Sequence, residues 1–257
     1  MALLTGPAGI GKSRLVGEVV AEAEMRGLAT ALGRATLTSV AAPFGPLTQV
    51  LLQLLRGRPL PADDDFRQWR AALATIVPAF ASDAGRGGQA AAVPAEAVVQ
   101  AEAVVQLLGR LTREAGAVLA LEDLHWADPD TLRLLGYMAD AVGAQPVVWV
   151  LTSRDVPESA AMHLASRIRE RRRVIHLPVR QLEPAEVAEM VLACRPGAPE
   201  ELVARVQRSA DGVPLFVEEI LASPGVPASF DAAVRARLAE LGDADRRVVQ
   251  AAAVLGR

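Results

Sequence analysis

Gly6-Pro7-Ala8-Gly9-Ile10-Gly11-Lys12-Ser13 fits the pattern G-x-x-x-x-G-K-S/T at every fixed position. Its glycines let the backbone turn tightly, so that several N–H groups converge on one point. A helix that begins at Ser13 adds its positive dipole end to the same point. We expect Lys12 to reach the β- and γ-phosphates of a nucleotide, and the hydroxyl of Ser13 to bind Mg²⁺. The stretch therefore predicts a phosphate-binding loop between a strand and a helix.

The surroundings of this loop favour the same prediction. Ala2–Thr5 is an apolar strand candidate before the loop, and the spacing of apolar residues predicts a helix over Ser13–Arg26. Lys12 is the only lysine among the 27 basic residues, and a phosphate loop needs a compact ammonium rather than a planar guanidinium. The alternative is a glycine-rich turn that matches by chance. We assign nucleotide contacts to the whole loop, Pro7, Ala8 and Ile10 included, and to Arg14 after it.

A second half of the site is expected where another strand ends in acidic residues. Ala117–Leu121 is a run of small and apolar residues, typical of a strand buried on both faces, and Glu122-Asp123 ends it. Asp123 lies 111 residues after Lys12 (123 − 12 = 111). A carboxylate here can hold Mg²⁺ through water while its neighbour orients the attacking water. The order Glu-Asp reverses the common Asp-Glu. We place Glu122 near the metal and Asp123 near the water; the alternative is an acidic pair that caps the following loop.

Two further candidates lie at strand ends. Arg154 ends the next buried strand candidate, Pro146–Thr152, from where a guanidinium could sense the γ-phosphate; the alternative is a surface arginine. His125 and Trp126 follow the acidic pair and are interpreted as side chains packed beneath a loop, rather than as a gate or a partner contact. The three histidines and the one cysteine are scattered, so they predict no metal-ligand set.

The order of the candidate elements predicts the fold class. Strands and helices alternate through Leu177, which predicts an α/β fold with a central parallel sheet covered on both faces, a P-loop NTPase three-layer sandwich. Beyond Gln181 we expect helices only, and we place a domain boundary near Arg180–Glu183.

The bulk composition excludes several classes of protein. The chain has 257 residues, 51% of them hydrophobic and 22% charged, which favours a globular fold over disorder. A net charge of −3 argues against nucleic-acid binding by the surface as a whole. Cys194 is the only cysteine and cannot form an internal disulfide, which fits a reducing cytosol. No apolar run approaches the roughly 18–20 residues needed to cross a bilayer. We therefore expect a cytoplasmic protein without a membrane partner.

The placed motifs resemble those of the ATPase domain of large bacterial LuxR-type, MalT-like regulators, members of the signal-transducing STAND branch of AAA+ ATPases. The resemblance covers nearly all of the chain. It is carried by Gly6–Leu15 (GPAGIGKSRL), Leu121–Leu135 (LEDLHWADPDTLRLL), Leu151–Arg154 (LTSR), Asp211–Ile220 (DGVPLFVEEI) and Val248–Arg257 (VVQAAAVLGR).

The resemblance implies roles for individual residues. Lys12 and Ser13 match the family's phosphate and magnesium positions, Glu122 and Asp123 its acidic strand end, and Arg154 its sensor arginine. Pro214 matches the proline of a G-x-P motif that packs near the adenine. The implied domains are an ATPase core over 1–180, a helical lid over 181–226 and part of a winged helix over 227–257.

The implied function is a bacterial transcriptional regulator's switch domain that binds ATP with Mg²⁺ and hydrolyses ATP slowly. A protein partner or self-association would act through the switch, and DNA would be bound only by a domain absent from this chain. Two departures, only five residues before Gly6 and an end inside the winged helix, suggest a fragment or a truncated product. The alternatives are a small-molecule P-loop kinase and a nucleotide-binding interaction module without turnover. ATP is favoured over GTP because no guanine-reading Asn/Thr-Lys-x-Asp element is present.

Overall fold

The computed structural model describes residues 1–36, 43–84, 97–141, 145–155, 159–169, 175–222, 238 and 242–254. The chain divides into two compact units. The first contains Met1–Pro7 and Lys12–Val179, and the second contains Ala8–Gly11 and Arg180–Arg257. Most of the predicted winged-helix segment before residue 242 lies outside the described residues.

The first unit is built on a five-stranded sheet with the order β2-β3-β4-β1-β5, in which neighbouring strands run parallel. Its strands are β1 (Ala2–Thr5), β2 (Ala29–Arg34), β3 (Ala117–Glu122), β4 (Val147–Ser153) and β5 (Ile175–Pro178). Every residue of β3 is buried, because strands flank it and its residues face two separate hydrophobic clusters. The parallel sheet confirms the predicted α/β fold.

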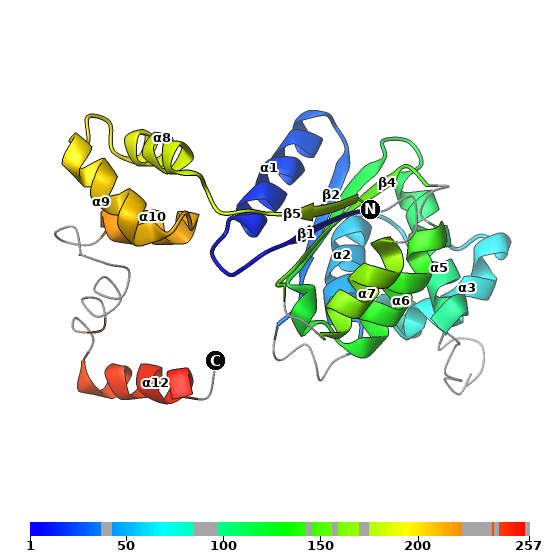
Figure 1. Ribbon diagram of the computed structural model, residues 1–257. Helices are drawn as coiled ribbons and strands as arrows, with labels where there is room; N and C mark the ends of the chain where they lie inside the picture. The colour runs from blue at the N-terminus through cyan, green and yellow to red at the C-terminus, as the bar shows by residue number, and fades with distance from the viewer. Residues whose placement is uncertain are drawn as a thin grey trace. The chain divides into compact units, whose positions relative to one another are not determined.

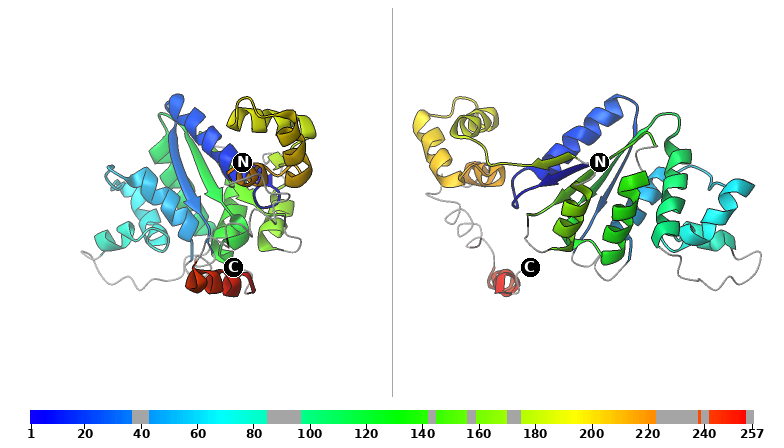
Figure 2. Two further views of the ribbon diagram at one scale, coloured as in Figure 1. Left: turned by 90° about the vertical axis from the view of Figure 1, so that its left-hand side faces the viewer. Right: turned by 45° about the vertical axis from the view of Figure 1, so that its right-hand side comes forward.

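Helices cover both faces of this sheet (Figures 1 and 2). On one face, α1 (Lys12–Met25) packs Val16 and Ala23 against residues such as Ala120 of β3. The larger core lies on the other face, where Leu119 and Leu121 point because side chains alternate along a strand. The helices that contribute to the larger core are α2 (Gly45–Leu55), α3 (Asp64–Ala74), α4 (Ala79–Ala84), α5 (Ala97–Thr112), α6 (Pro129–Ala141) and α7 (Ala160–Arg169).

A loop expected from composition over Ser82–Gly88 is contradicted in its first three residues. The Gly- and Ala-rich composition of Ser82–Gly88 predicts a loop, but residues 82–84 belong to α4. Phe80 is fully buried in the large core and contacts the ring of Phe66, with 6.2 Å between the two ring centroids. This anchored aromatic residue fixes α4 against the core, so tertiary packing outweighs the local composition. Residues 85–88 lie outside the described part of the chain.

The edge strand β2 is protected by α2. Leu32 and Arg34 each donate a backbone N–H to a glutamine side chain of α2, Gln53 at 3.0 Å and Gln49 at 3.0 Å. The amide of Gln53 returns a bond to the carbonyl of Leu32 at 2.6 Å. These bonds satisfy polar groups that an edge strand leaves without a neighbouring strand.

The second unit has helices α8 (Pro184–Cys194), α9 (Glu200–Ala210), α10 (Pro214–Ala222) and α12 (Asp243–Val254). Seven buried apolar residues form its core: Val187, Val191, Leu202, Val206, Ala210, Val217 and Ile220. Gly212 has φ +67°, and a Cβ there would lie 2.4 Å from the carbonyl oxygen of Leu182, so glycine is required. Within the described residues, no helix has the length and apolar character needed to cross a membrane.

Candidate functional site

The parallel sheet brings the predicted site residues to one edge. The phosphate-loop stretch follows β1, the acidic pair ends β3, and Arg154 follows β4. Since β1, β3 and β4 run in the same direction, their carboxyl ends lie at the same edge of the sheet. Two of these strands, β1 and β3, flank β4.

The side chain of Lys12 folds back over the start of its own loop. Its ammonium donates hydrogen bonds to the carbonyl oxygens of Gly6 and Pro7, each at 2.8 Å. The residue is 8% exposed although it carries a charge. Gly11, with φ +101°, supplies the left-handed backbone before it, a conformation that other residues rarely adopt. Ser13 lies exposed in the first turn of α1, as a residue that binds a ligand-held metal should.

The two acidic residues at the end of β3 have different surroundings. Glu122 is 2% exposed, and its Oε1 has no hydrogen-bond partner in the described part of the chain. The side chain of Asp123 is 33% exposed. Asp123 adopts a left-handed backbone, φ 59° and ψ 41°, before the short turn η2 (Leu124–Trp126). The left-handed residue ends the strand and turns the chain, so successive carboxylates face different environments.

Arg34 is a site residue that the sequence reasoning missed. Its guanidinium donates to Oε2 of Glu122 from Nη2 at 2.5 Å and from Nε at 3.2 Å. Nε also lies 3.9 Å from Oδ2 of Asp123. The hydrogen bond and the charge of Glu122 raise the pKa of Arg34. The sequence shows an arginine at the carboxyl end of a strand candidate. It does not show that this strand lies beside β3.

Two side-chain bonds connect the end of β4 to the acidic turn. The backbone N–H of Asp123 donates to Oγ1 of Thr152 at 3.0 Å. The backbone N–H of Arg154 donates to Nδ1 of His125 at 3.3 Å. His125 also packs against Trp126, with 5.1 Å between ring centroids. The side chain of Arg154 itself is exposed.

Electrostatics connect these residues across the strand ends. Burial lowers the pKa of Lys12, while the charge of Asp123 raises it and that of Arg154 lowers it. Burial also lowers the pKa of His125. The charge of Asp123 raises this pKa, and the charges of Arg154 and Lys12 lower it. Lys12, Asp123, His125 and Arg154 therefore lie close enough to share one electrostatic environment.

The residues fit a magnesium ion held mainly by a nucleotide. Among the described residues no group of three or more His, Cys, Asp or Glu side chains could hold a metal by itself. Mg²⁺ beside phosphates needs only one or two protein ligands. The orphaned Oε1 of Glu122 and the exposed hydroxyl of Ser13 are oxygen donors of the required kind.

Five of the predicted contact residues, Ala8–Gly11 and Pro214, belong to the second unit. Ala8, Gly9, Ile10 and Gly11 belong to the second unit, in which the N–H of Leu215 donates to the carbonyl oxygen of Gly9 at 3.2 Å. Pro214 is the first residue of α10 in that unit. The predicted role of Pro214 at an adenine, and those of Ala8 and Arg14 at the nucleotide, remain predictions.

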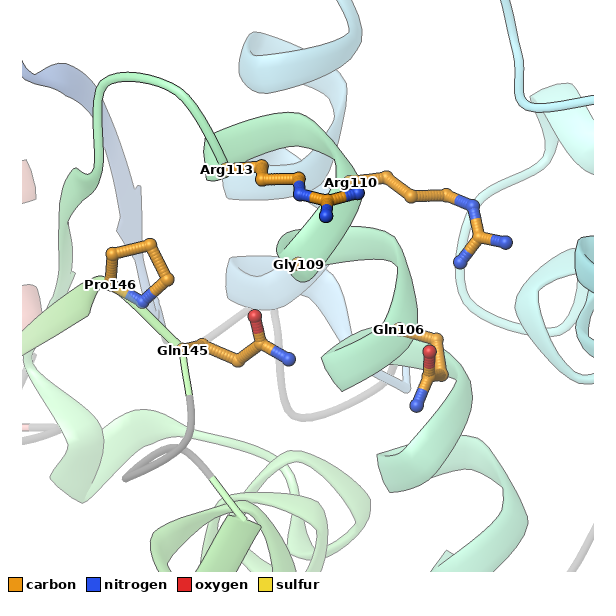
Figure 3. Close-up of a pocket in the computed structure, with 6 residues that line it drawn as sticks. All are labelled: Gln106, Gly109, Arg110, Arg113, Gln145 and Pro146. Carbon is orange, nitrogen blue, oxygen red and sulfur yellow. The ribbon is translucent and has the colours of Figure 1, made fainter.

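A separate cavity lies far from these residues along the strands. It has a volume of about 470 Å³ and lies between the second half of α5 and the residues that lead into β4 (Figure 3). Its lining consists of Gln106, Gly109, Arg110, Arg113, Gln145 and Pro146. The N–H of Ala117 donates to the carbonyl oxygen of Pro146 at 2.9 Å, so the cavity adjoins the amino ends of β3 and β4. The site at their carboxyl ends is separated from it by the length of the sheet.

Comparison with known protein sequences gives a family match. Residues 1–150 match the AAA ATPase domain, which is 150 of the 257 residues. An uncharacterized protein of Rhizobium meliloti (strain 1021) is 28% identical over 298 residues. The alignment covers 100% of this chain and 27% of that relative, so the chain spans much less than the full length of the relative.

Solved structures show the same fold at low identity. A STAND protein with a tetratricopeptide repeat sensor from Pyrococcus horikoshii has a TM-score of 0.52 and 15% identity, over 94% of this chain and 30% of that one. The Walker-type ATPase of Pyrococcus abyssi has a TM-score of 0.51 and 15% identity, over 100% of this chain and 70% of that one. At this identity the likeness concerns the fold.

Proposed function

The chain belongs to the AAA ATPase domain family, and from this premise we propose that it binds ATP with Mg²⁺ and acts as a nucleotide-dependent switch. The observation that carries the proposal is the position of Lys12. A buried ammonium lies on the loop carbonyls of Gly6 and Pro7 and within the electrostatic reach of Asp123. The two carbonyl oxygens accept hydrogen bonds but do not neutralise the charge, and a buried charge is costly without a counter-charge, so this placement favours a site made for an anion.

Each residue of the proposed site has a chemical task. Lys12 and the loop amides would hold the β- and γ-phosphates, and Arg154 would bind the γ-phosphate from the end of β4. Bound Mg²⁺, held by Ser13 and Glu122, would neutralise charge that develops on the phosphates. Asp123 would orient the attacking water, since its carboxylate is partly exposed and close to Lys12. Arg34 would hold the Glu122 carboxylate in place.

The switch itself is an equilibrium between conformations. ATP changes their populations only by its different affinity for each of them. Slow hydrolysis of ATP would allow the chain to return to the conformational equilibrium of its nucleotide-free state. Because the chain covers 27% of its curated relative, parts that sense a signal or bind DNA would lie elsewhere in a longer protein, as expected for a transcriptional regulator of the LuxR type.

The test is a titration of the purified chain with ATP and Mg²⁺ by calorimetry. Lys12→Ala should abolish measurable binding, and Lys12→Arg should not restore it, because a guanidinium cannot replace the compact ammonium. Arg26→Ala is the matched control, since Arg26 lies just beyond the same helix and pairs with Glu22 on the surface at 2.7 Å. An unchanged affinity in Lys12→Ala would refute the proposal.

A further inference from the structure

The contacts at the end of β4 continue past the strand pairing. The ladder between β3 and β4 ends at Leu121 and Leu151, and that between β1 and β4 ends at Thr5 and Ser153. Arg154 is therefore the first residue beyond both ladders. Its backbone N–H is held by a side chain, Nδ1 of His125, at 3.3 Å.

This hydrogen bond determines which nitrogen of His125 carries the proton. An imidazole nitrogen that accepts a hydrogen bond has its lone pair free, so in the neutral ring the proton must be on the other nitrogen. Nδ1 accepts from Arg154, which assigns the proton to Nε2 by the geometry of the network. Nε2 is buried and has no partner in the described part of the chain. A native structure rarely leaves a buried donor in this state, which points to a constraint on His125 other than its own packing.

His125 lies beside the proposed nucleotide site. His125 follows Asp123 by two residues, and both are tied to β4, His125 through Arg154 and Asp123 through Thr152. The Trp126 ring packs against the imidazole and fixes its plane. Nδ1 of His125 is thus held by the neighbouring ring of Trp126 and by the turn that follows the acidic pair. A histidine that only filled space would not need its Nδ1 directed at the backbone of the sensor arginine.

We propose that His125 is a positioning residue that, as the Nε2–H tautomer, fixes the backbone of Arg154 so that its guanidinium is directed at the γ-phosphate. This inference rests on the proposed function, since it assigns Arg154 to the terminal phosphate. His125 acts through Arg154 and does not itself contact the nucleotide. Without the acceptor at Nδ1, the backbone of Arg154 is no longer fixed, and its charged side chain is no longer directed at one position.

The first experiment needs no nucleotide. Nitrogen-15 NMR of the imidazole ring should show His125 as the Nε2–H tautomer, and the amide signal of Arg154 should move in His125→Ala. His125→Asn places a carbonyl oxygen near the position of Nδ1, so it should restore the Arg154 amide signal. His125→Gln places its amide near Nε2 and should not. A ring protonated on Nδ1, or an Arg154 amide indifferent to His125→Ala, overturns the inference.

The second experiment measures the preference for ATP over ADP, as the ratio of their dissociation constants. Arg154→Ala should lower this preference about tenfold, the effect of one charge-assisted contact to the γ-phosphate. His125→Ala should lower it by a similar factor, the double variant should lose no more than either single one, and His125→Asn should recover most of the loss. The control His163→Ala changes an exposed histidine of α7 and should leave the preference unchanged.

The outcomes separate the two ideas. If the losses in His125→Ala and Arg154→Ala add, or if His125→Asn is as impaired as His125→Ala, the positioning role is wrong while ATP binding stands. If the wild-type chain binds ATP no better than Lys12→Ala does, the proposed function is wrong. The NMR result then still decides which tautomer His125 adopts and whether it holds Arg154.

Discussion

Arg34 and Glu122 are register partners on the neighbouring parallel strands β2 and β3, and the guanidinium of one binds the carboxylate of the other. The two partners differ in exposure: the Glu122 side chain is 2% exposed and the Arg34 side chain is 51% exposed. The buried carboxylate therefore depends on a cation that reaches it from the solvent side. An isolated buried charge costs several kcal/mol, so the pairing supplies a counter-charge to the carboxylate that the proposed site uses.

Arg34→Ala should destabilise the fold, because it leaves the buried Glu122 without its partner. We expect the free energy of unfolding in urea to fall by about 2 kcal/mol, less than for a fully buried pair because Arg34 is half in solvent. Adding Glu122→Gln should recover part of the loss, since a neutral amide needs no counter-charge. Arg133→Ala, which breaks an exposed pair with Asp130, is the control and should cost less than about 0.5 kcal/mol. Equal losses in the two arginine variants would contradict the special role of Arg34.

Gly33 and Gly17 should respond in opposite ways to alanine. A Cβ at Gly33 would lie 2.0 Å from the carbonyl oxygen of Pro46, so α2 must move away from β2 and its glutamine bonds to the edge strand must break. We expect Gly33→Ala to lose at least about 3 kcal/mol or to fail to fold. At Gly17, in the exposed face of α1, a Cβ meets nothing within 4 Å. Gly17→Ala should therefore gain about 0.5–1 kcal/mol from helix propensity. Thermal unfolding of both variants measures the contrast.

The sequence predicts β3 well because this strand is buried on both faces. Ala117–Leu121 is apolar at every position, and β3 spans Ala117–Glu122 with every residue buried. Pro129 follows this strand and suits the first turn of a helix, and α6 begins at this residue. By contrast, the pairing of Arg34 with Glu122 depends on which strands are neighbours, which local patterns do not contain. Local patterns also miss α4, because its stability comes from the buried Phe80 rather than from its own composition.

Within the candidate site, the parts fixed by backbone geometry are those the sequence anticipates. A glycine-rich loop before Lys12 and an acidic strand end follow from spacing and composition alone. The interactions of side chains with residues that are distant along the chain do not, as Asp128 shows. The sequence places Asp128 before a proline that opens a helix, but not its bond to Phe44, which lies 84 residues away along the chain.

Asp128→Ala should be strongly destabilising although the residue lies outside the proposed phosphate contacts. Its Oδ1 accepts from the backbone N–H of Thr131 at 2.8 Å and of Phe44 at 3.2 Å, and its Oδ2 accepts from the Thr131 hydroxyl at 2.6 Å. Alanine would remove the N-cap of α6 and leave buried donors unpaired, at a cost of about 2–4 kcal/mol.

Two comparisons test that reason. Asp128→Asn keeps an acceptor oxygen and should cost about 1 kcal/mol. Asp130→Ala, two residues along on the exposed side of α6, should cost less than about 0.5 kcal/mol, because Asp130 makes an exposed ion pair with Arg133. A loss in Asp130→Ala as large as that in Asp128→Ala would show that the acidic charge near the helix start, and not the hydrogen bonds of Asp128, stabilises α6.

Glu122→Gln and Asp123→Asn should separate the metal-binding carboxylate from the one that orients water. Glu122 is buried and its Oε1 has no partner in the described part of the chain, whereas Asp123 is partly exposed and within the electrostatic reach of Lys12. If Glu122 serves the metal, Glu122→Gln should raise the Mg²⁺ concentration needed for half-maximal ATP binding by about tenfold, the effect of losing one anionic ligand. If Asp123 serves the water, Asp123→Asn should bind ATP and Mg²⁺ normally but release phosphate at least about 100-fold more slowly. Calorimetry at several Mg²⁺ concentrations and a phosphate-release assay measure both variants.

The reverse pattern, with magnesium dependence changed in Asp123→Asn and turnover alone lost in Glu122→Gln, would exchange the two roles. Arg34 would then be the residue that holds the water-orienting carboxylate.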